Sequence, residues 1–148
     1  MRGTYVLLVH VPYDLATSVG ELGTLNFKAG YYAYIGSALG GLKGRVGRHL
    51  REEKKLRWHI DYLLARARAV DVVLARGRTR KECAVADELS KHFAGVRGFG
   101  SSDCKCGSHL FYSPDFHELL RQVLLSFRAC GLKPVKGGEV GQTMGPQA

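Results

Sequence analysis

The sequence predicts an α+β fold in which a small antiparallel sheet of about three strands is flanked by helices. Runs rich in β-branched and aromatic residues at 5–11, 30–36 and 70–75 are typical of buried strands. Other segments carry apolar residues three and four positions apart, a spacing typical of amphipathic helices. Such helices are expected at 42–53, 57–68, 80–93 and 114–130.

The first third of the chain is expected to be strands and turns. Pro12-Tyr13-Asp14 ends the first strand, and residues 17–22 and 24–28 flank Gly23 as an inserted hairpin. The second strand ends at Gly36, and a glycine-containing turn at 37–41 leads to the first helix. The end of the second strand should therefore lie beside the start of that helix.

The middle of the chain is expected to pack one helix face and one strand into the core. The apolar face of helix 57–68 consists of Ile60, Leu63, Leu64 and Ala67. The strand at 70–75 follows. Thr79 precedes Glu82 by three positions, which is the spacing of a capping box, so we expect the next helix to start there.

The length of 148 residues suits one domain with a real core and is too short for two. We expect this domain at residues 1–132, with a core at about 1–95 and an extension at 96–132 that ends in a C-terminal helix. Residues 133–148 are rich in glycine, proline and polar groups and are predicted to form a disordered tail.

The chain is strongly basic, with 22 lysines and arginines against 13 acidic residues and a formal net charge of +9. The excess gathers at 43–57 and 66–81, which favours a polyanionic partner, DNA above all. A general role in solubility is the alternative. No stretch is long and apolar enough for a membrane helix, and the chain enters a strand pattern directly, without a signal peptide. We therefore expect a cytoplasmic protein with no membrane partner.

One segment combines an aromatic strand end with a basic helix. Tyr34-Ile35-Gly36-Ser37 closes the second strand, and Gly3-Thr4-Tyr5 opens the first. Leu42, Arg45 and His49 then follow at i, i+3 and i+7, so they share one helix face. This arrangement predicts a cationic and aromatic corner suited to a phosphate group. An exposed helix charge at Arg45 and a helix-end position for His49 are the alternative.

These motifs and the element order resemble the GIY-YIG nuclease family over about residues 1–95. The resemblance implies a single-metal site that hydrolyses phosphodiester bonds in DNA with Mg²⁺ or Mn²⁺. Its catalytic residues would be Tyr5, Tyr34, Arg45, His49 and Glu82. Two features depart from the family pattern: the first motif reads Gly-Thr-Tyr, and 28 residues separate the two tyrosines, an excess that the hairpin would absorb.

Two further segments resemble a prokaryotic subfamily of uncharacterised GIY-YIG-like proteins. They are Trp58-His59-Ile60-Asp61-Tyr62 and Gly98-Phe99-Gly100-Ser101-Ser102-Asp103-Cys104-Lys105-Cys106-Gly107-Ser108-His109-Leu110. Some members of that subfamily are fused to endonuclease III-type repair glycosylases. The resemblance therefore implies a role in DNA repair and such a glycosylase as a partner.

The chemistry of these side chains fits phosphodiester hydrolysis. The carboxylate of Glu82 would hold the metal, because Mg²⁺ takes oxygen ligands. The planar guanidinium of Arg45 would bind a phosphate oxygen and offset developing charge. Tyr5 or Tyr34 would orient or deprotonate the attacking water. A purely structural role for Glu82 in the capping box is the alternative.

Contacts to DNA are expected from side chains along the basic segment. The predicted contacts are Ser37, Lys43, Arg48, Lys54, Lys55 and His59. For His59, an ordinary exposed histidine is the alternative. His59 and Asp61 are two positions apart on a predicted helix, so they should not act as a pair.

The cysteines allow three interpretations. Cys104 and Cys106 lie close to His109, and Cys83 or Cys130 could complete a Zn²⁺ site. A disulfide is the second, and a glycine- and serine-rich loop that contacts phosphate is the third.

Three functional classes follow: a metal-dependent endonuclease, a nucleic-acid-binding module without catalysis, and an interaction subunit of a DNA-repair enzyme. The first two differ in whether Arg45 and Glu82 face one cavity.

Overall fold

The structure is a computed structural model that describes residues 2–38, 45, 47–49, 58–101 and 105–137. Its strands are β1 (Gly3–Val11), β2 (Leu15–Ser18), β3 (Thr24–Phe27), β4 (Gly30–Ala38), β5 (Arg68–Arg76), β6 (Ala94–Gly95), β7 (Leu110–Ser113) and β8 (Val135–Lys136). Its helices are the 3-10 turn η1 (Gly20–Leu22), α2 (His59–Leu64), α3 (Glu82–Ser90) and α4 (Phe116–Ala129). Arg45 and residues 47–49 are helical, and the rest of the helix predicted at 42–53 lies outside the described residues.

The main sheet confirms the α+β class and has more strands than predicted. Its order is β6-β7-β4-β1-β5-β8, and every neighbouring pair is antiparallel. The three predicted strands form its centre, with β1 between β4 and β5. The expected count of about three was wrong because β6, β7 and β8 have only two to four residues each, too few for a clear alternation.

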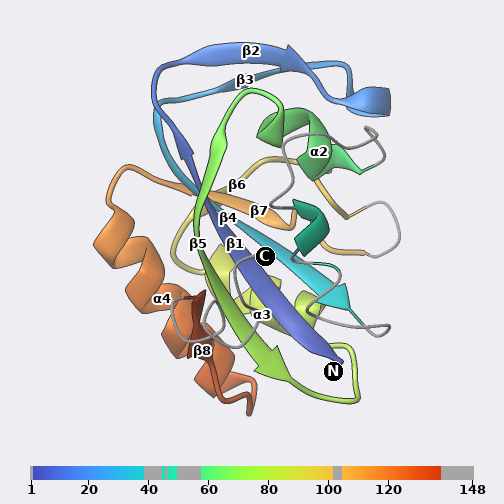
Figure 1. The fold of residues 1–148 in the computed structure, drawn as a ribbon, viewed down its shortest axis with the longest axis vertical. Coiled ribbons are helices and arrows are strands. Elements are labelled where there is room, and N and C mark those ends of the chain that lie inside the picture. The colour runs from blue at the N-terminus through green and yellow to red at the C-terminus, as the bar shows by residue number, and fades with distance from the viewer. Residues whose placement is uncertain (1, 39–44, 46, 50–57, 102–104, 138–148) are drawn as a thin grey trace.

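The sheet is buried on both faces, which explains the uninterrupted apolar run of β1. Tyr5, Leu7 and Val9 point into one core with α2 and the β2–β3 hairpin. Val6 and Leu8 point into the opposite core with α3 and α4. A strand covered on both faces is expected to be apolar at every position rather than at alternate ones. Figure 1 shows the hairpin and α2 together at one end of the molecule.

Several predicted boundaries are corrected. Helix 57–68 is shortened to α2, because the chain enters β5 at Arg68. The capping box at Thr79 is wrong: α3 begins only at Glu82, after an N-cap Lys81 that makes no side-chain cap hydrogen bond. A cap must directly precede the first helical turn, and Thr79 lies too far upstream.

The C-terminal elements were predicted in part. α4 is confirmed, and the Asp115 side chain caps it by accepting from the backbone N–H groups of His117 and Glu118. Within the predicted tail, Val135 and Lys136 pair with β5 as β8. Residues 138–148 lie outside the described residues.

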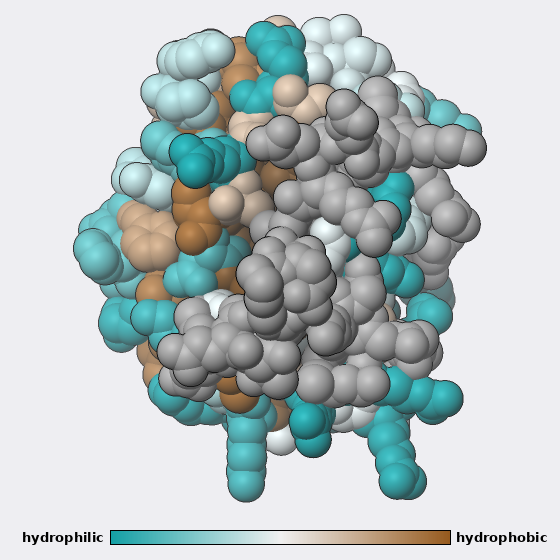
Figure 2. Space-filling model, in the orientation of Figure 1, coloured by the Kyte–Doolittle hydropathy of each residue, from teal (hydrophilic) through white to brown (hydrophobic). Residues whose placement is uncertain are grey.

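Hydrophilic side chains predominate at the edge of one face of the molecule. Figure 2 shows hydrophilic side chains along the left and lower edges of the face turned to the viewer, and apolar side chains just inside the left edge. Among the described residues, no helix combines the length and the apolar character needed to cross a membrane.

Candidate functional site

A cleft opens where β4 extends past its neighbour β7. The pairing with β7 covers residues 31–34 of β4, and beyond it the Ile35 N–H donates to the His109 carbonyl. The cleft has a volume of about 740 Å³. Eight of the predicted site residues line it: Tyr5, Tyr34, Ser37, Arg45, His59, Glu82, Cys83 and His109. The structure therefore brings Arg45 and Glu82 to one cavity.

The position of Tyr5 is set by the register of the central strands. Tyr5 on β1 lies opposite Gly36 on β4, and its ring fills the space that a Cβ at position 36 would need. Its hydroxyl lies 2.7 Å from Nε2 of His49, which is buried. His49 is not among the residues that line the cleft, so it can influence the cleft indirectly, by its hydrogen bond to Tyr5.

Both motif tyrosines are held in their neutral form by burial. Burial raises the pKa of Tyr5 far above its ordinary value, and nearby Tyr34 adds to the rise while Arg45 opposes it. Burial likewise raises the pKa of Tyr34 to about 12, again against the charge of Arg45. At neutral pH the cleft therefore presents two protonated phenols.

Arg45 is anchored at the mouth of this aromatic group. Its Nη1 donates to the Ser37 carbonyl at 3.3 Å, and its Cζ lies 4.5 Å from the centre of the Trp58 ring. A guanidinium has five N–H donors in a planar fork. The side chain is half-buried, so it can bind an anion in the cleft without leaving its support.

Arg48 has a different environment from the one predicted for a DNA contact. Its guanidinium bonds to both carboxylate oxygens of Asp61, at 2.8 and 3.0 Å, and lies 4.1 Å from the Trp58 ring centre. Asp61 is fully buried and also accepts from the Trp58 backbone N–H at 2.8 Å. This ion pair fastens the helix at 47–49 to α2, and Arg48 is not among the residues that line the cleft.

His59 lines the cleft and bonds to the backbone of Gly100, whereas Asp61 bonds to Arg48. Nδ1 of His59 accepts a hydrogen bond from the Gly100 N–H at 2.8 Å. Burial lowers its pKa, so a neutral imidazole is favoured. The accepting Nδ1 places the proton of that neutral ring on Nε2.

Glu82 has the surroundings expected of a cation ligand. It is the first residue of α3, where the helix dipole favours a negative charge. Its Oε2 is buried and has no hydrogen-bond partner in the structure as described. A buried carboxylate oxygen without a donor is costly, and a bound cation would remove that cost.

A second group of side chains borders the cleft. Cys83, Cys106 and His109 bring three ligand atoms within 4.8 Å of one another, so they could hold a metal. Cys83 Sγ lies 3.8 Å from His109 Nε2. Cys130 is not part of the group, and Cys104 lies outside the described residues. Of the two residues predicted to complete the site, the structure therefore selects Cys83.

The three described cysteines, Cys83, Cys106 and Cys130, form no disulfide with one another.

Some predicted residues cannot be placed, and others were missed. Lys43, Lys54 and Lys55 lie outside the described residues. Trp58 and Arg80 line the cleft and were not predicted as site residues. Arg80 lies two positions before Glu82 in a basic segment, a proximity that could have indicated it.

The comparisons with known proteins identify the family. A family model for a domain of unknown function, DUF123, matches residues 4–132. The chain belongs to the DUF123 family. Neither the curated proteins nor the solved structures gave a match. The match to DUF123 covers both the cleft and the cluster of Cys83, Cys106 and His109.

Proposed function

We propose that this DUF123 protein is a metal-dependent endonuclease that hydrolyses phosphodiester bonds in DNA. The observation that carries the proposal is the meeting of Arg45 and Glu82 in one cleft with the two motif tyrosines. Arg45 lies near the end of β4. Glu82 is the first residue of α3, the helix that packs with α4 on one face of the sheet. An anion-binding fork and an unsatisfied carboxylate oxygen are the parts that a metal-assisted phosphoryl reaction needs.

The residues present fit a hard divalent cation. Glu82 would hold Mg²⁺ or Mn²⁺ through its buried Oε2, with water and substrate phosphate as the other ligands. When bound, the ion would supply charge stabilisation for the leaving oxygen. No second carboxylate among the described residues lines the cleft, which matches a one-carboxylate Mg²⁺ site.

Arg45 would bind the phosphate and offset the charge that develops on it. Its hydrogen bond to the Ser37 carbonyl and its stacking on Trp58 hold the guanidinium in advance of binding. Such preorganised donors lower the transition-state energy without a cost of reorganisation. Arg80, which also lines the cleft two positions before Glu82, would add a contact to a neighbouring phosphate.

The tyrosines would orient the attacking water rather than act as strong bases. Their raised pKa values keep both phenols protonated at neutral pH, so each can donate a hydrogen bond to water or phosphate. His49 would be a positioning residue, because it acts through its hydrogen bond to Tyr5.

We further propose that the endonuclease acts in DNA repair. This role rests on the resemblance to GIY-YIG-like proteins fused to endonuclease III-type glycosylases and on the net charge of +9. A glycosylase of that kind would be the protein partner.

The test is nicking of supercoiled and branched DNA with Mg²⁺ or Mn²⁺ present or chelated. Glu82→Gln and Arg45→Ala should each remove most cleavage and leave the circular dichroism spectrum unchanged. Glu88→Gln is the matched control, because Glu88 lies on the same helix and pairs with Lys91 at the surface. Cleavage that persists in EDTA, or in Glu82→Gln, would refute the proposal.

A nucleic-acid-binding module without catalysis is the second candidate. The observation that favours it is the neutral state of both phenols, which leaves the cleft without an ionised tyrosine to act as base at neutral pH. DNA that is bound in a salt-dependent manner but stays uncut with every metal would select this alternative.

A further inference from the structure

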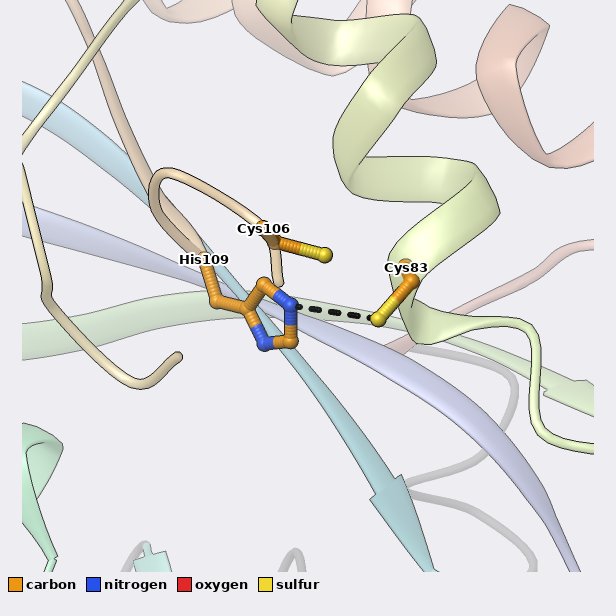
Figure 3. A group of neighbouring side chains, drawn as sticks. All are labelled: Cys83, Cys106 and His109. Atoms are coloured by element: carbon orange, nitrogen blue, oxygen red, sulfur yellow. Dashed lines mark hydrogen bonds between the residues drawn. The ribbon is translucent and has the colours of Figure 1, made fainter. Parts of the chain in front are cut away.

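We propose that Cys83, Cys106 and His109 form a Zn²⁺ site that fastens the loop before β7 to the first turn of α3. Figure 3 shows Cys83 extending from the start of α3, and Cys106 and His109 extending toward it from that loop. The two sulfur atoms and the imidazole point toward one another. Cys83 and His109 line the same cleft as Glu82, but Glu82 is not a member of the ligand group, and the zinc site does not depend on the proposed nuclease activity.

The spacing of the ligand atoms fits a tetrahedral ion. With Zn–S near 2.3 Å and Zn–N near 2.0 Å, sulfur and nitrogen ligands of a tetrahedral zinc lie about 3.5 Å apart. Cys83 Sγ and His109 Nε2 are separated by 3.8 Å, and all three ligand atoms lie within 4.8 Å of one another. Small side-chain rotations would therefore bring the set to zinc geometry.

The donor set selects the kind of metal. Two thiolates and an imidazole favour Zn²⁺, whereas Mg²⁺ and Mn²⁺ favour carboxylate and water oxygens. His109 is buried and both cysteines are half-buried, so bulk water has limited access to the ligands. Because zinc is four-coordinate, one further position accepts water or another group.

A zinc ion at this site would link the loop before β7 to the first turn of α3, and these two segments meet at the cleft. Lys81 gives α3 no side-chain cap, so the first turn of this helix lacks the usual local support. On the other side, the His109 backbone bonds to Phe99 and Ile35. A zinc ion between Cys83 and His109 would thus fix the neighbouring Glu82 relative to the edge of β4.

The test is the metal content of protein purified without a polyhistidine tag. Elemental analysis should find about one zinc ion per chain in the wild type. Cys83→Ser and Cys106→Ser should lower the zinc to background. Cys130→Ser is the matched control and should keep it, because Cys130 lies outside the cluster.

A second measurement keeps the proposal testable if those variants misfold. Wild-type protein with Co²⁺ in place of zinc should show thiolate-to-cobalt charge-transfer absorption and the d–d bands of a tetrahedral ion. Wild type that takes up neither Zn²⁺ nor Co²⁺, or folded Cys83→Ser and Cys106→Ser that keep full zinc content, would overturn the proposal.

Failure of this site and failure of the nuclease proposal are distinguishable. Glu82→Gln should retain its zinc while losing Mg²⁺-dependent cleavage, because Glu82 is not a member of the cluster. A wild type that cuts DNA but contains no zinc would leave the nuclease proposal standing and refute the zinc site alone.

Discussion

Gly36 and Tyr5 lie opposite each other on β4 and β1, and the Tyr5 ring occupies the volume in which a side chain at position 36 would stand. Tyr5 is 1 % exposed and its hydroxyl is hydrogen-bonded to His49, so its ring cannot shift without losing packing contacts and that bond. The glycine of the second sequence motif is therefore needed because of the tyrosine of the first. Gly36→Ala should destabilise the fold by about 1–3 kcal/mol, the usual cost of overpacking a core. It should also reduce cleavage, because the Tyr5 hydroxyl would move. Urea unfolding and DNA nicking measure the two effects.

Gly47→Ala is the matched control for that substitution. Gly47 is helical, and beyond its own helix no atom of the described residues lies within 4 Å of a Cβ placed there. Alanine in a helix is favoured over glycine by up to about 1 kcal/mol, so this variant should be as stable as wild type or more so. Equal stability of Gly36→Ala and Gly47→Ala would contradict the packing argument.

The ion pair between Arg48 and Asp61 should be important for stability. Arg48→Ala leaves the fully buried carboxylate of Asp61 without its bidentate partner, and we expect a loss of about 3 kcal/mol in unfolding free energy. Arg121→Ala is the control, because its ion pair with Glu118 is exposed, and it should leave stability nearly unchanged. Similar denaturation midpoints for both variants would show that Asp61 does not depend on Arg48.

Stability at alkaline pH should report the burial of Tyr34. Because its pKa in the folded state is raised from 10.0 to about 12, the neutral phenol contributes stability below pH 10 that is lost as the pH rises through 12. In Tyr34→Phe, the loss of unfolding free energy over this pH range should be smaller than in the wild type by on the order of 2 kcal/mol. Tyr13→Phe, at a position 61 % exposed, should decline as the wild type does. Parallel curves for all three proteins would count against the buried phenol.

The two arginines that line the cleft should differ in their kinetic effect. Arg45→Lys should lower kcat by about 10²–10³, the cost of losing a preorganised transition-state donor, because an ammonium cannot reproduce the fork. Arg80→Ala should instead weaken DNA binding and lower the salt dependence by about one unit of slope. Nicking rates at saturating DNA and binding at several salt concentrations separate the effects. The same kcat for Arg45→Lys and wild type would exclude the proposed role.

The sequence predicted the elements whose signals are local and long. β1, β4 and β5 were found because they are rich in β-branched, aromatic and other apolar residues. Tyr5, Tyr34, Arg45 and Glu82 were found because they match the strand and helix motifs that carry the family resemblance. β7 was missed because its four residues follow a loop rich in glycine and serine. The start of α3 was misplaced because Thr79 satisfied a spacing rule that the backbone does not use.

Features that depend on tertiary pairing could not be predicted. The bond of Arg48 to Asp61 joins helices separated by residues outside the described part of the chain, and nothing in the spacing indicates it. The approach of Cys83 to His109 likewise requires α3 and the loop before β7 to meet across 26 positions. Sequence reasoning named both residues as ligand candidates but left Cys130 as an equal alternative to Cys83.

The contact of Trp58 with two guanidinium groups makes this residue an intrinsic fluorescent reporter of the cleft. It is the single tryptophan of the chain, and Arg45 and Arg48 both stack on its indole ring. Arg48 is held by Asp61, whereas Arg45 faces the cleft. An anion bound to Arg45 would change the electrostatic environment of the indole and therefore the emission of this one fluorophore, so binding at Arg45 can be followed without any label.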